Sequence, residues 1–312
     1  MQALLEVILP VALVVGYGYL ARVRGWISDE AVAMLTKFAQ NFAVPLLLFS
    51  GIAQMDLGET FHLPLLLSFY IGAFSGGAFA FFGARYLFKR SLTDSIAIGF
   101  VGWFSNGMLL GIPITERAYG IEALAWNFAV ISIHAPLLYG CGITAMELAR
   151  AQGQNISATK LAKQVSSAIL HNPLIIGISA GWIVNVTGLS LPLPVWDAVN
   201  LMKSSAIPVA LFGLGGVLVR YRPEGDMRII AWTVTASLVV HPLITYGLGH
   251  FVFDLEVGPL RSAALTAAMA TGVNGYLFAD MYGSAKRVAA SSVLIGTALS
   301  ALTIWCWLAI LP

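Results

Sequence analysis

The sequence predicts an all-α integral membrane protein with ten transmembrane helices in two inverted five-helix repeats. Three observations carry this prediction: an apolar composition, ten apolar runs of spanning length, and a weak match between the two halves. Of the 312 residues, 58% are hydrophobic and only 10% are charged, whereas soluble domains carry about a quarter charged residues. This composition excludes an ordinary soluble enzyme, a nucleic-acid-binding protein and a disordered scaffold. Long apolar runs, rather than weak alternation, indicate helices instead of a β-barrel.

Each apolar run is bounded by polar or turn-rich residues. A helix that crosses a membrane needs about 20 mostly apolar residues, so each run is predicted to be one span. The runs occupy approximately residues 3–20, 32–53, 63–88, 94–119, 121–146, 167–188, 196–218, 229–252, 258–282 and 286–311.

Basic residues are concentrated in alternate loops. Of the 17 Lys and Arg residues, 13 follow the odd-numbered runs, Arg117 and Arg261 lie on the opposite side, and Lys37 and Lys203 lie within runs. Cytoplasmic loops are enriched in Lys and Arg, so both termini are expected on the non-cytoplasmic side of the plasma (inner) membrane. The first run carries its positive charges after the apolar stretch, unlike a cleaved signal peptide, and is predicted to be a true span.

The two halves match at an offset of 163 residues. Residues 43–49 align with residues 206–212, and the Tyr-Gly pair at 119–120 aligns with the Tyr-Gly pair at 282–283. A repeat of five spans forces the second copy into the opposite orientation. Inverted repeats are typical of secondary transporters, which bind substrate near the midplane. The predicted division is a first repeat over 1–149, a short cytoplasmic linker over 150–165 and a second repeat over 166–312.

The fourth and ninth runs contain helix-breaking residues near their middles. Interior Gly costs a helix about 1 kcal/mol and Pro about 3, and backbone freed at this depth must be buried in protein or line a wet cavity. A half-helix that restarts there presents free N–H groups and a positive dipole end, which favour an anionic ligand. Tight helix packing is the alternative explanation. The predicted substrate-binding residues in these runs are Asn106, Gly107, Gly111, Pro113, Thr271, Gly272, Asn274 and Gly275.

Three further residues within spans are predicted to belong to the site: Asn41, His134 and Lys203. His134 could carry a coupled proton, or could be a neutral histidine bonded between helices. Lys203 could contact a carboxylate substrate or pair with Asp197. No carboxylate is predicted at mid-depth, which argues against a cation/proton antiporter, while sodium held by carbonyl groups is left open. No catalytic residue and no metal site are predicted.

Several of these segments together resemble the auxin efflux carrier family, which includes bacterial members and the plant PIN proteins. The resemblance covers nearly the whole chain. It implies a scaffold of helices 1, 2, 6 and 7, a transport domain of helices 3–5 and 8–10, crossed fourth and ninth helices, a homodimer and elevator-like movement. The segments that carry it are Asn41 to Pro45, Asn106-Gly107, Gly111-Ile112-Pro113, Asn172-Pro173, 208–212 and Asn274-Gly275-Tyr276.

The ninth run departs from the family pattern, because Ala270-Thr271 stands where relatives often have proline before the Asn. Bacterial relatives are linked to malate and malonate, and plant relatives to indole-3-acetate. The sequence therefore predicts a secondary active transporter or facilitator of a small organic anion, without a resident cofactor and with possible proton coupling. A sodium-coupled symporter of the bile acid type is the alternative. A membrane enzyme would need a catalytic set such as H-E-x-x-H, which the sequence lacks.

Overall fold

The computed structural model describes residues 4–151, 159, 162–163, 166–167, 170–221 and 223–312. In this part of the chain all regular elements are helices, and β-type pairing is limited to one antiparallel bridge between Ser105 and Thr271. The all-α prediction is confirmed. Most of the predicted linker 150–165, together with the basic residues Lys160 and Arg222, lies outside the described residues.

Seven helical segments of the described chain are long and apolar enough to cross a membrane, as expected of an integral membrane protein. They are Glu6–Val23, Asp29–Ala53, Leu63–Leu87, Ile121–Arg150, Leu193–Leu218, Met227–Val252 and Lys286–Ile310.

The first half of the chain alternates α-helices with short π- or 3₁₀-helical turns. Its elements are η1 (Leu4–Ile8), α1 (Leu9–Val23), α2 (Asp29–Phe38), η2 (Ala39–Ala43), α3 (Val44–Ala53), α4 (Leu57–Thr60), α5 (Leu63–Phe82), η3 (Gly83–Leu87), α6 (Leu92–Trp103), η4 (Gly107–Gly111), α7 (Ile112–Tyr119), η5 (Ile121–Ala123) and α8 (Leu124–Arg150).

The second half follows a similar order. Its elements are α10 (Pro173–Thr187), α11 (Leu193–Ser204), α12 (Ala206–Leu218), α13 (Met227–Thr235), η6 (Ala236–Val240), α14 (His241–Gly247), η7 (Leu248–Val252), α15 (Val257–Ala267), α16 (Val273–Tyr282) and α17 (Lys286–Ile310).

The two predicted breaks are present, and they pair with each other. Three residues separate the end of α6 from the start of η4, and five residues separate the end of α15 from the start of α16. The backbone N–H of Asn106 donates to the carbonyl of Ala270 (2.8 Å), and the N–H of Gly272 donates to the carbonyl of Phe104 (3.1 Å). Backbone groups at membrane depth need partners within the protein. The two interruptions therefore satisfy part of each other's backbone where the segments meet.

Two helix ends in the two halves have the same unusual geometry. Lys89, after η3, and Asp254, after η7, both have positive φ (53° and 46°), although neither is glycine. Just after them, the N–H groups of Arg90 and Leu255 each donate to the carbonyl six residues earlier, at 2.9 and 2.8 Å. Positive φ is uncommon for such residues. It recurs at two helix ends that lie 165 residues apart, one in each half of the chain.

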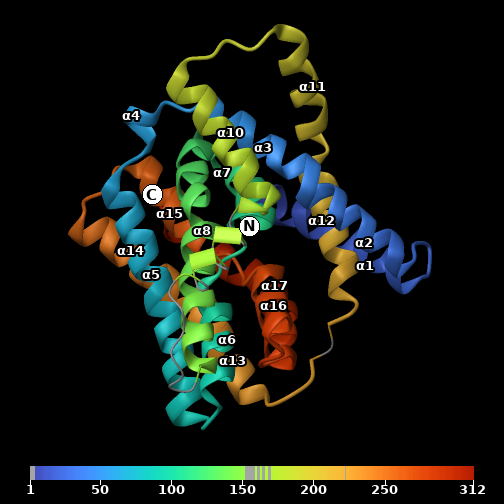
Figure 1. Cartoon of the computed structure of the whole chain (residues 1–312), viewed down its shortest axis with the longest axis vertical. Coiled ribbons are helices and arrows are strands. Elements are labelled where there is room, and N and C mark those ends of the chain that lie inside the picture. Colours follow the sequence, from blue (N-terminus) through green and yellow to red (C-terminus); the bar gives the residue numbers. More distant parts are fainter. Residues whose placement is uncertain (1–3, 152–158, 160–161, 164–165, 168–169, 222) are drawn as a thin grey trace.

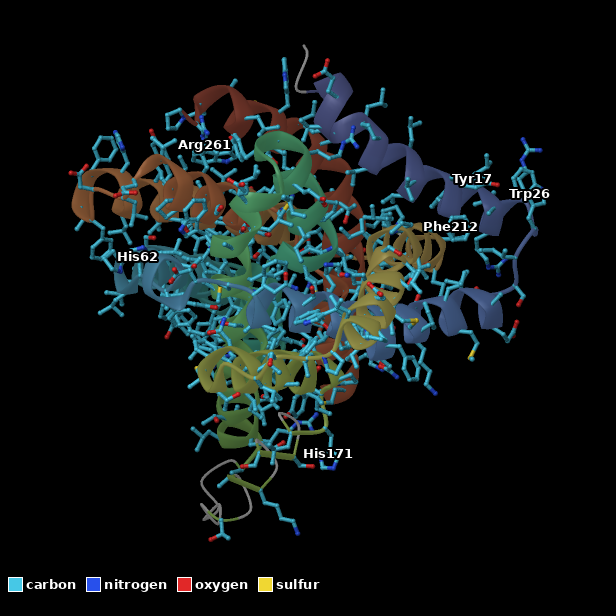
Figure 2. All side chains as sticks on the ribbon, turned by 90° about the horizontal axis from the view of Figure 1, so that it is seen from above. Tyr17, Trp26, His62, His171, Phe212 and Arg261 are labelled. Carbon is cyan, nitrogen blue, oxygen red and sulfur yellow. The ribbon has the colours of Figure 1, made fainter. Side chains whose placement is uncertain are left out.

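Figure 1 shows α1, α2 and α12 extending together on one side of the molecule, while α5, α6 and α14 lie on the other. On the first side, α1 packs along α12 and α10 packs along α3. The rings of Tyr17 and Phe212 lie edge to face with centroids 5.5 Å apart, and Figure 2 shows these side chains next to each other. Close packing of helices needs small residues at the contacts, and Gly18 and Gly181 fill that role here.

Candidate functional site

A cavity of about 440 Å³ lies where the two interrupted segments meet η2, α8 and the start of α10. His171 lines the cavity and is exposed, and Figure 2 places it at the edge of the molecule, so the cavity opens to the surface there. Six predicted site residues line the cavity: Asn41, Asn106, Gly107, His134, Gly272 and Asn274.

Two asparagines in the cavity wall are helix caps. Asn106 precedes η4, and its Oδ1 accepts a hydrogen bond from the N–H of Leu109 (3.2 Å). Asn172 precedes α10, and its Oδ1 accepts from the N–H of Leu174 (3.0 Å). Asparagine is a preferred N-cap because its oxygen satisfies an otherwise unpaired N–H. With each oxygen occupied, the amide NH₂ groups have no acceptor among the described residues and remain available to a ligand.

A third asparagine is oriented by a tyrosine. The hydroxyl of Tyr139 in α8 donates to Oδ1 of Asn274 in α16 (3.3 Å), and both residues line the cavity. In this orientation of the amide, no described residue accepts a hydrogen bond from the NH₂ group of Asn274. All three amides therefore offer donors to the cavity.

Asn106 and Asn274 occupy different positions relative to the helices that they begin. Asn106 caps its half-helix, whereas Asn274 is the second residue of α16 and Gly272 stands at the cap. Gly272 is extended (φ −73°, ψ 164°). The ninth span thus breaks without proline because Gly272 leaves the helical region before α16 starts.

Five predicted site residues are not in the cavity wall: Gly111, Pro113, Thr271, Gly275 and Lys203. The hydroxyl of Thr271 donates to the carbonyl of Val101 (2.6 Å), so it fixes the backbone of the break. Pro113 is the second residue of α7, which continues η4 without a gap, so it lies inside the half-helix that Asn106 caps. Substrate contact by these residues stays a prediction.

Gly275 and Lys203 have other contacts in this structure. A Cβ on Gly275 would lie 2.8 Å from Cγ2 of Thr271, so glycine permits close packing there. The ammonium group of Lys203 donates to the hydroxyl of Ser50 (3.0 Å), and no ion pair with Asp197 lies within 4.0 Å. Lys203 therefore ties α11 to α3 in this conformation.

His134 is buried beside the cavity, next to the backbone of Ser105. Its ring packs against Phe104 (centroids 4.6 Å apart) and Phe69 (5.6 Å). Neither ring nitrogen has a hydrogen-bond partner among the described residues, and only 7% of the side chain is exposed. Buried polar groups are normally hydrogen-bonded to protein or ordered water. His134 is thus placed to bond to water or a ligand in the cavity.

Sequence reasoning missed Asn172 and Tyr139 as site residues. Asn172 had a detectable signal, since Asn before a proline that opens an apolar run is typical of a helix N-cap. Tyr139 lies within an apolar run, and its partner Asn274 is 135 residues away. No local pattern links them.

The cavity wall carries no fixed charge among the described residues: neither Asp, Glu, Lys nor Arg lines it. Apolar side chains, including Phe104, Met108 and Leu277, form most of the remaining wall. Ligand sites of this kind combine an apolar wall with a few well-placed polar groups. The chemistry on offer is hydrogen-bond donation from neutral amides and from the starts of two helices.

Residues 3–308 match the family described as membrane transport protein. The chain belongs to this family. It is 25% identical to a protein named "Putative malonate transporter" from Rhizobium meliloti, over 97% of this chain and 94% of that protein. It is 23% identical to an uncharacterised transporter from Methanocaldococcus jannaschii, over 97% of both chains, and 24% identical to another from Methanothermobacter thermautotrophicus, over 98% of both.

The predicted family is therefore confirmed, and the chain is a multi-pass membrane transport protein and not an enzyme. The relatives match along nearly their whole lengths.

Proposed function

We propose that this membrane transport protein carries a small organic anion, a carboxylate such as malonate or malate or an auxin-like indole acid, as a secondary active transporter or facilitator. One observation carries the proposal: the NH₂ groups of Asn106, Asn172 and Asn274 have no acceptor among the described residues, whereas each amide oxygen already accepts one hydrogen bond. A carboxylate is an acceptor without donors, and it matches such a wall without the desolvation cost of a buried cation. The name of the Rhizobium relative agrees with this class.

The direct test is uptake of radiolabelled malonate, malate and indole-3-acetate into proteoliposomes, with and without sodium and with an imposed pH gradient. We expect uptake of at least one of these acids above that of empty liposomes. Uptake of none of them, by protein that is folded and reconstituted, would overturn the proposal.

The proposed architecture is the ten-helix inverted repeat, with a scaffold of helices 1, 2, 6 and 7 and a transport domain of helices 3–5 and 8–10 that moves in an elevator-like way. The matching ends at Lys89 and Asp254 support it. The glycine contacts support it too, because Gly18 meets the carbonyl of Phe212 and Gly181 meets that of Phe49. Gly181 lies 163 residues after Gly18, and Phe212 lies 163 residues after Phe49, which is the offset seen in the sequence.

The remaining features of the proposal come from the family resemblance and the charge pattern. They are a homodimer in the plasma (inner) membrane, in contact with membrane lipid, with both termini on the non-cytoplasmic side. The cavity lies between the proposed scaffold, which contributes η2 and α10, and the proposed transport domain, which contributes α8 and the two breaks. A site at such a boundary is what alternating access requires.

Replacing His134 by glutamine is expected to remove the pH dependence of transport, if a proton moves with the substrate. Two titratable groups lie near this imidazole. One is Tyr70, whose ring centroid is 6.2 Å away and whose hydroxyl already donates to the carbonyl of Val130 (2.7 Å). The other is His241, which packs against the same Phe69 ring as His134. Glutamine keeps hydrogen-bonding capacity but cannot titrate. Uptake measured between pH 5 and 8 checks this, and an unchanged profile would return His134 to a structural role.

Replacing Tyr139 by phenylalanine is expected to raise the KM for a carboxylate about fivefold. The loss of one hydrogen bond, worth about 1 kcal/mol, frees the Asn274 amide to turn its oxygen toward the substrate. The measurement is the concentration dependence of uptake, with Tyr86→Phe as the matched control because Tyr86 is 72% exposed. Equal KM values for the Tyr139 variant and the wild type would show that this hydroxyl does not orient the site.

A further inference from the structure

A second cavity, of about 500 Å³, adjoins the central one. The two cavities share Gln40, Val273 and Leu277 in their walls, so they meet at η2 and the first turns of α16. Unlike the central cavity, the second is lined by charged side chains from three parts of the chain: α2, the segment after α12 and the start of α17. These side chains are Lys37, Arg220, Glu224, Lys286 and Arg287.

Two of these cations are already paired. Nε of Arg220 lies 3.2 Å from Oδ1 of Asp29, and Nζ of Lys286 lies 2.8 Å from Oδ1 of Asp280. Both pairs are about half exposed, and such pairs contribute little to stability. Asp29 also pairs with Arg22 (2.6 Å), so Arg220 shares its carboxylate. The two pairs hold the ends of α12 and α17 at the rim of the cavity.

The other two cations have no acidic partner. Neither Lys37 nor Arg287 has a carboxylate within 4.0 Å among the described residues. Glu224 is the sole carboxylate among the described side chains of the wall. Burial raises the pKa of the Tyr221 phenol well above its usual value, so this wall residue stays a neutral donor. The cavity therefore keeps an excess of positive charge.

The opposite side of the protein has no comparable excess. Its two arginines, Arg117 and Arg261, each donate to a backbone carbonyl, that of Glu6 and that of Pro312. Arg261 also lies over the ring of Tyr119, 4.6 Å from its centroid. Within the described chain, cations without an acidic partner therefore line a cavity on the side that carries the 13 basic loop residues.

We propose that the second cavity is an anion-binding antechamber, in which Lys37 and Arg287 hold a carboxylate dianion before it enters the neutral central cavity. This inference rests on the proposed function. Charge of one sign in a cleft raises the local concentration of a counter-charged ligand and its rate of association. Placing the cations in the hydrated antechamber supplies attraction without burying a charge at the central site. The phosphate of an anionic lipid headgroup has the same chemistry and is the competing occupant.

The test compares wild type with Lys37→Gln/Arg287→Gln in lipid-free detergent micelles. The matched control is Arg24→Gln, which removes an exposed positive charge of the same side that lines neither cavity. At low ionic strength we expect the double variant to bind malonate about five- to tenfold more weakly and the control to bind it equally well. The affinity for indole-3-acetate, a monoanion, should fall less than the affinity for malonate. At about 0.5 M salt the difference should fall below twofold because exposed charges are screened.

Sulfate separates failure of this inference from failure of the proposed function. It is a dianion that the antechamber should hold whatever the central cavity binds. Thermal stabilisation by sulfate at low ionic strength should therefore be smaller in the double variant and unchanged in Asn106→Ala. If no carboxylate binds but this sulfate difference is present, the proposed function is wrong and the antechamber stands. Equal binding of malonate and of sulfate by wild type and double variant would overturn the antechamber.

A last experiment tests whether the phosphate of a lipid headgroup occupies the second cavity. Adding phosphatidylglycerol to the micelles should leave most of the malonate difference in place. If the two proteins differ only when this anionic lipid is present, the basic cavity holds a headgroup and the proposal is wrong.

Discussion

Replacing Asn106 by aspartate is expected to abolish carboxylate uptake while the protein stays folded. Aspartate can still cap η4, because its oxygen accepts from the N–H of Leu109 as the amide oxygen does now; both residues are good N-caps. The NH₂ donor, however, becomes a second carboxylate oxygen in a wall that bears no cation among its described residues. Juxtaposed like charges cost several kcal/mol, so uptake should fall by roughly a hundredfold or more.

Two further variants separate the cap from the donor. Asn106→Ser keeps an oxygen that can cap the helix but loses the amide donor, and Asn106→Ala loses both. We expect Asn106→Ala to abolish uptake and to lower stability by about 1 kcal/mol, and Asn106→Ser to lose uptake with less loss of stability. Uptake into proteoliposomes and thermal unfolding in detergent give the two readouts.

Asn200→Asp provides the control, since Asn200 is exposed on α11 and lines no part of the cavity. It should transport like wild type. Wild-type uptake by Asn106→Asp would remove Asn106 from the binding site and would leave the fourth-span break with a structural role only.

The breaks could be predicted from sequence because their causes are local. Two glycines, an asparagine and a proline within one apolar run are incompatible with an uninterrupted helix. The helix α6 ends at Trp103, before the first of these residues. The position of Pro113 did not locate the gap, because the half-helix already starts at Gly107 and the π-type turn η4 directly precedes the proline; such local adjustments let membrane helices accommodate proline.

Which residues face the cavity could not be predicted, because this depends on how the segments cross. Thr271 and Gly272 are adjacent in the same break, yet Gly272 lines the cavity and Thr271 turns toward Val101. Lys203 was predicted to contact substrate because it is a charge within a span, but its ammonium group donates to Ser50, which lies in a helix far away in sequence. Charge content identifies unusual residues, whereas only the packing decides what they contact.

Adding one methyl group at Gly18, which is buried where α1 packs along α12, is expected to destabilise the protein strongly. A Cβ at Gly18 would lie 2.0 Å from the backbone oxygen of Phe212, so α1 and α12 would have to move apart. A backbone atom cannot turn aside as a side chain can, and overpacking of this kind costs about 3 kcal/mol or more. Thermal unfolding of Gly18→Ala in detergent should show a drop in Tm on the order of 10 °C.

The two halves of the chain allow a graded comparison. Gly181 makes the equivalent contact between α10 and α3, but its Cβ would lie 2.9 Å from the oxygen of Phe49, so Gly181→Ala should destabilise less than Gly18→Ala. Gly16 is the matched control, because a Cβ there meets nothing within 4 Å, and alanine stabilises a helix relative to glycine by about 0.5 to 1 kcal/mol.

Unfolding temperatures in the order Gly16→Ala, Gly181→Ala, Gly18→Ala, from highest to lowest, would indicate that both glycines hold paired helices together in the proposed scaffold. If Gly18→Ala and Gly16→Ala unfold at the same temperature, α1 and α12 do not pack closely in the membrane protein. The glycine pair would then no longer support an inverted repeat.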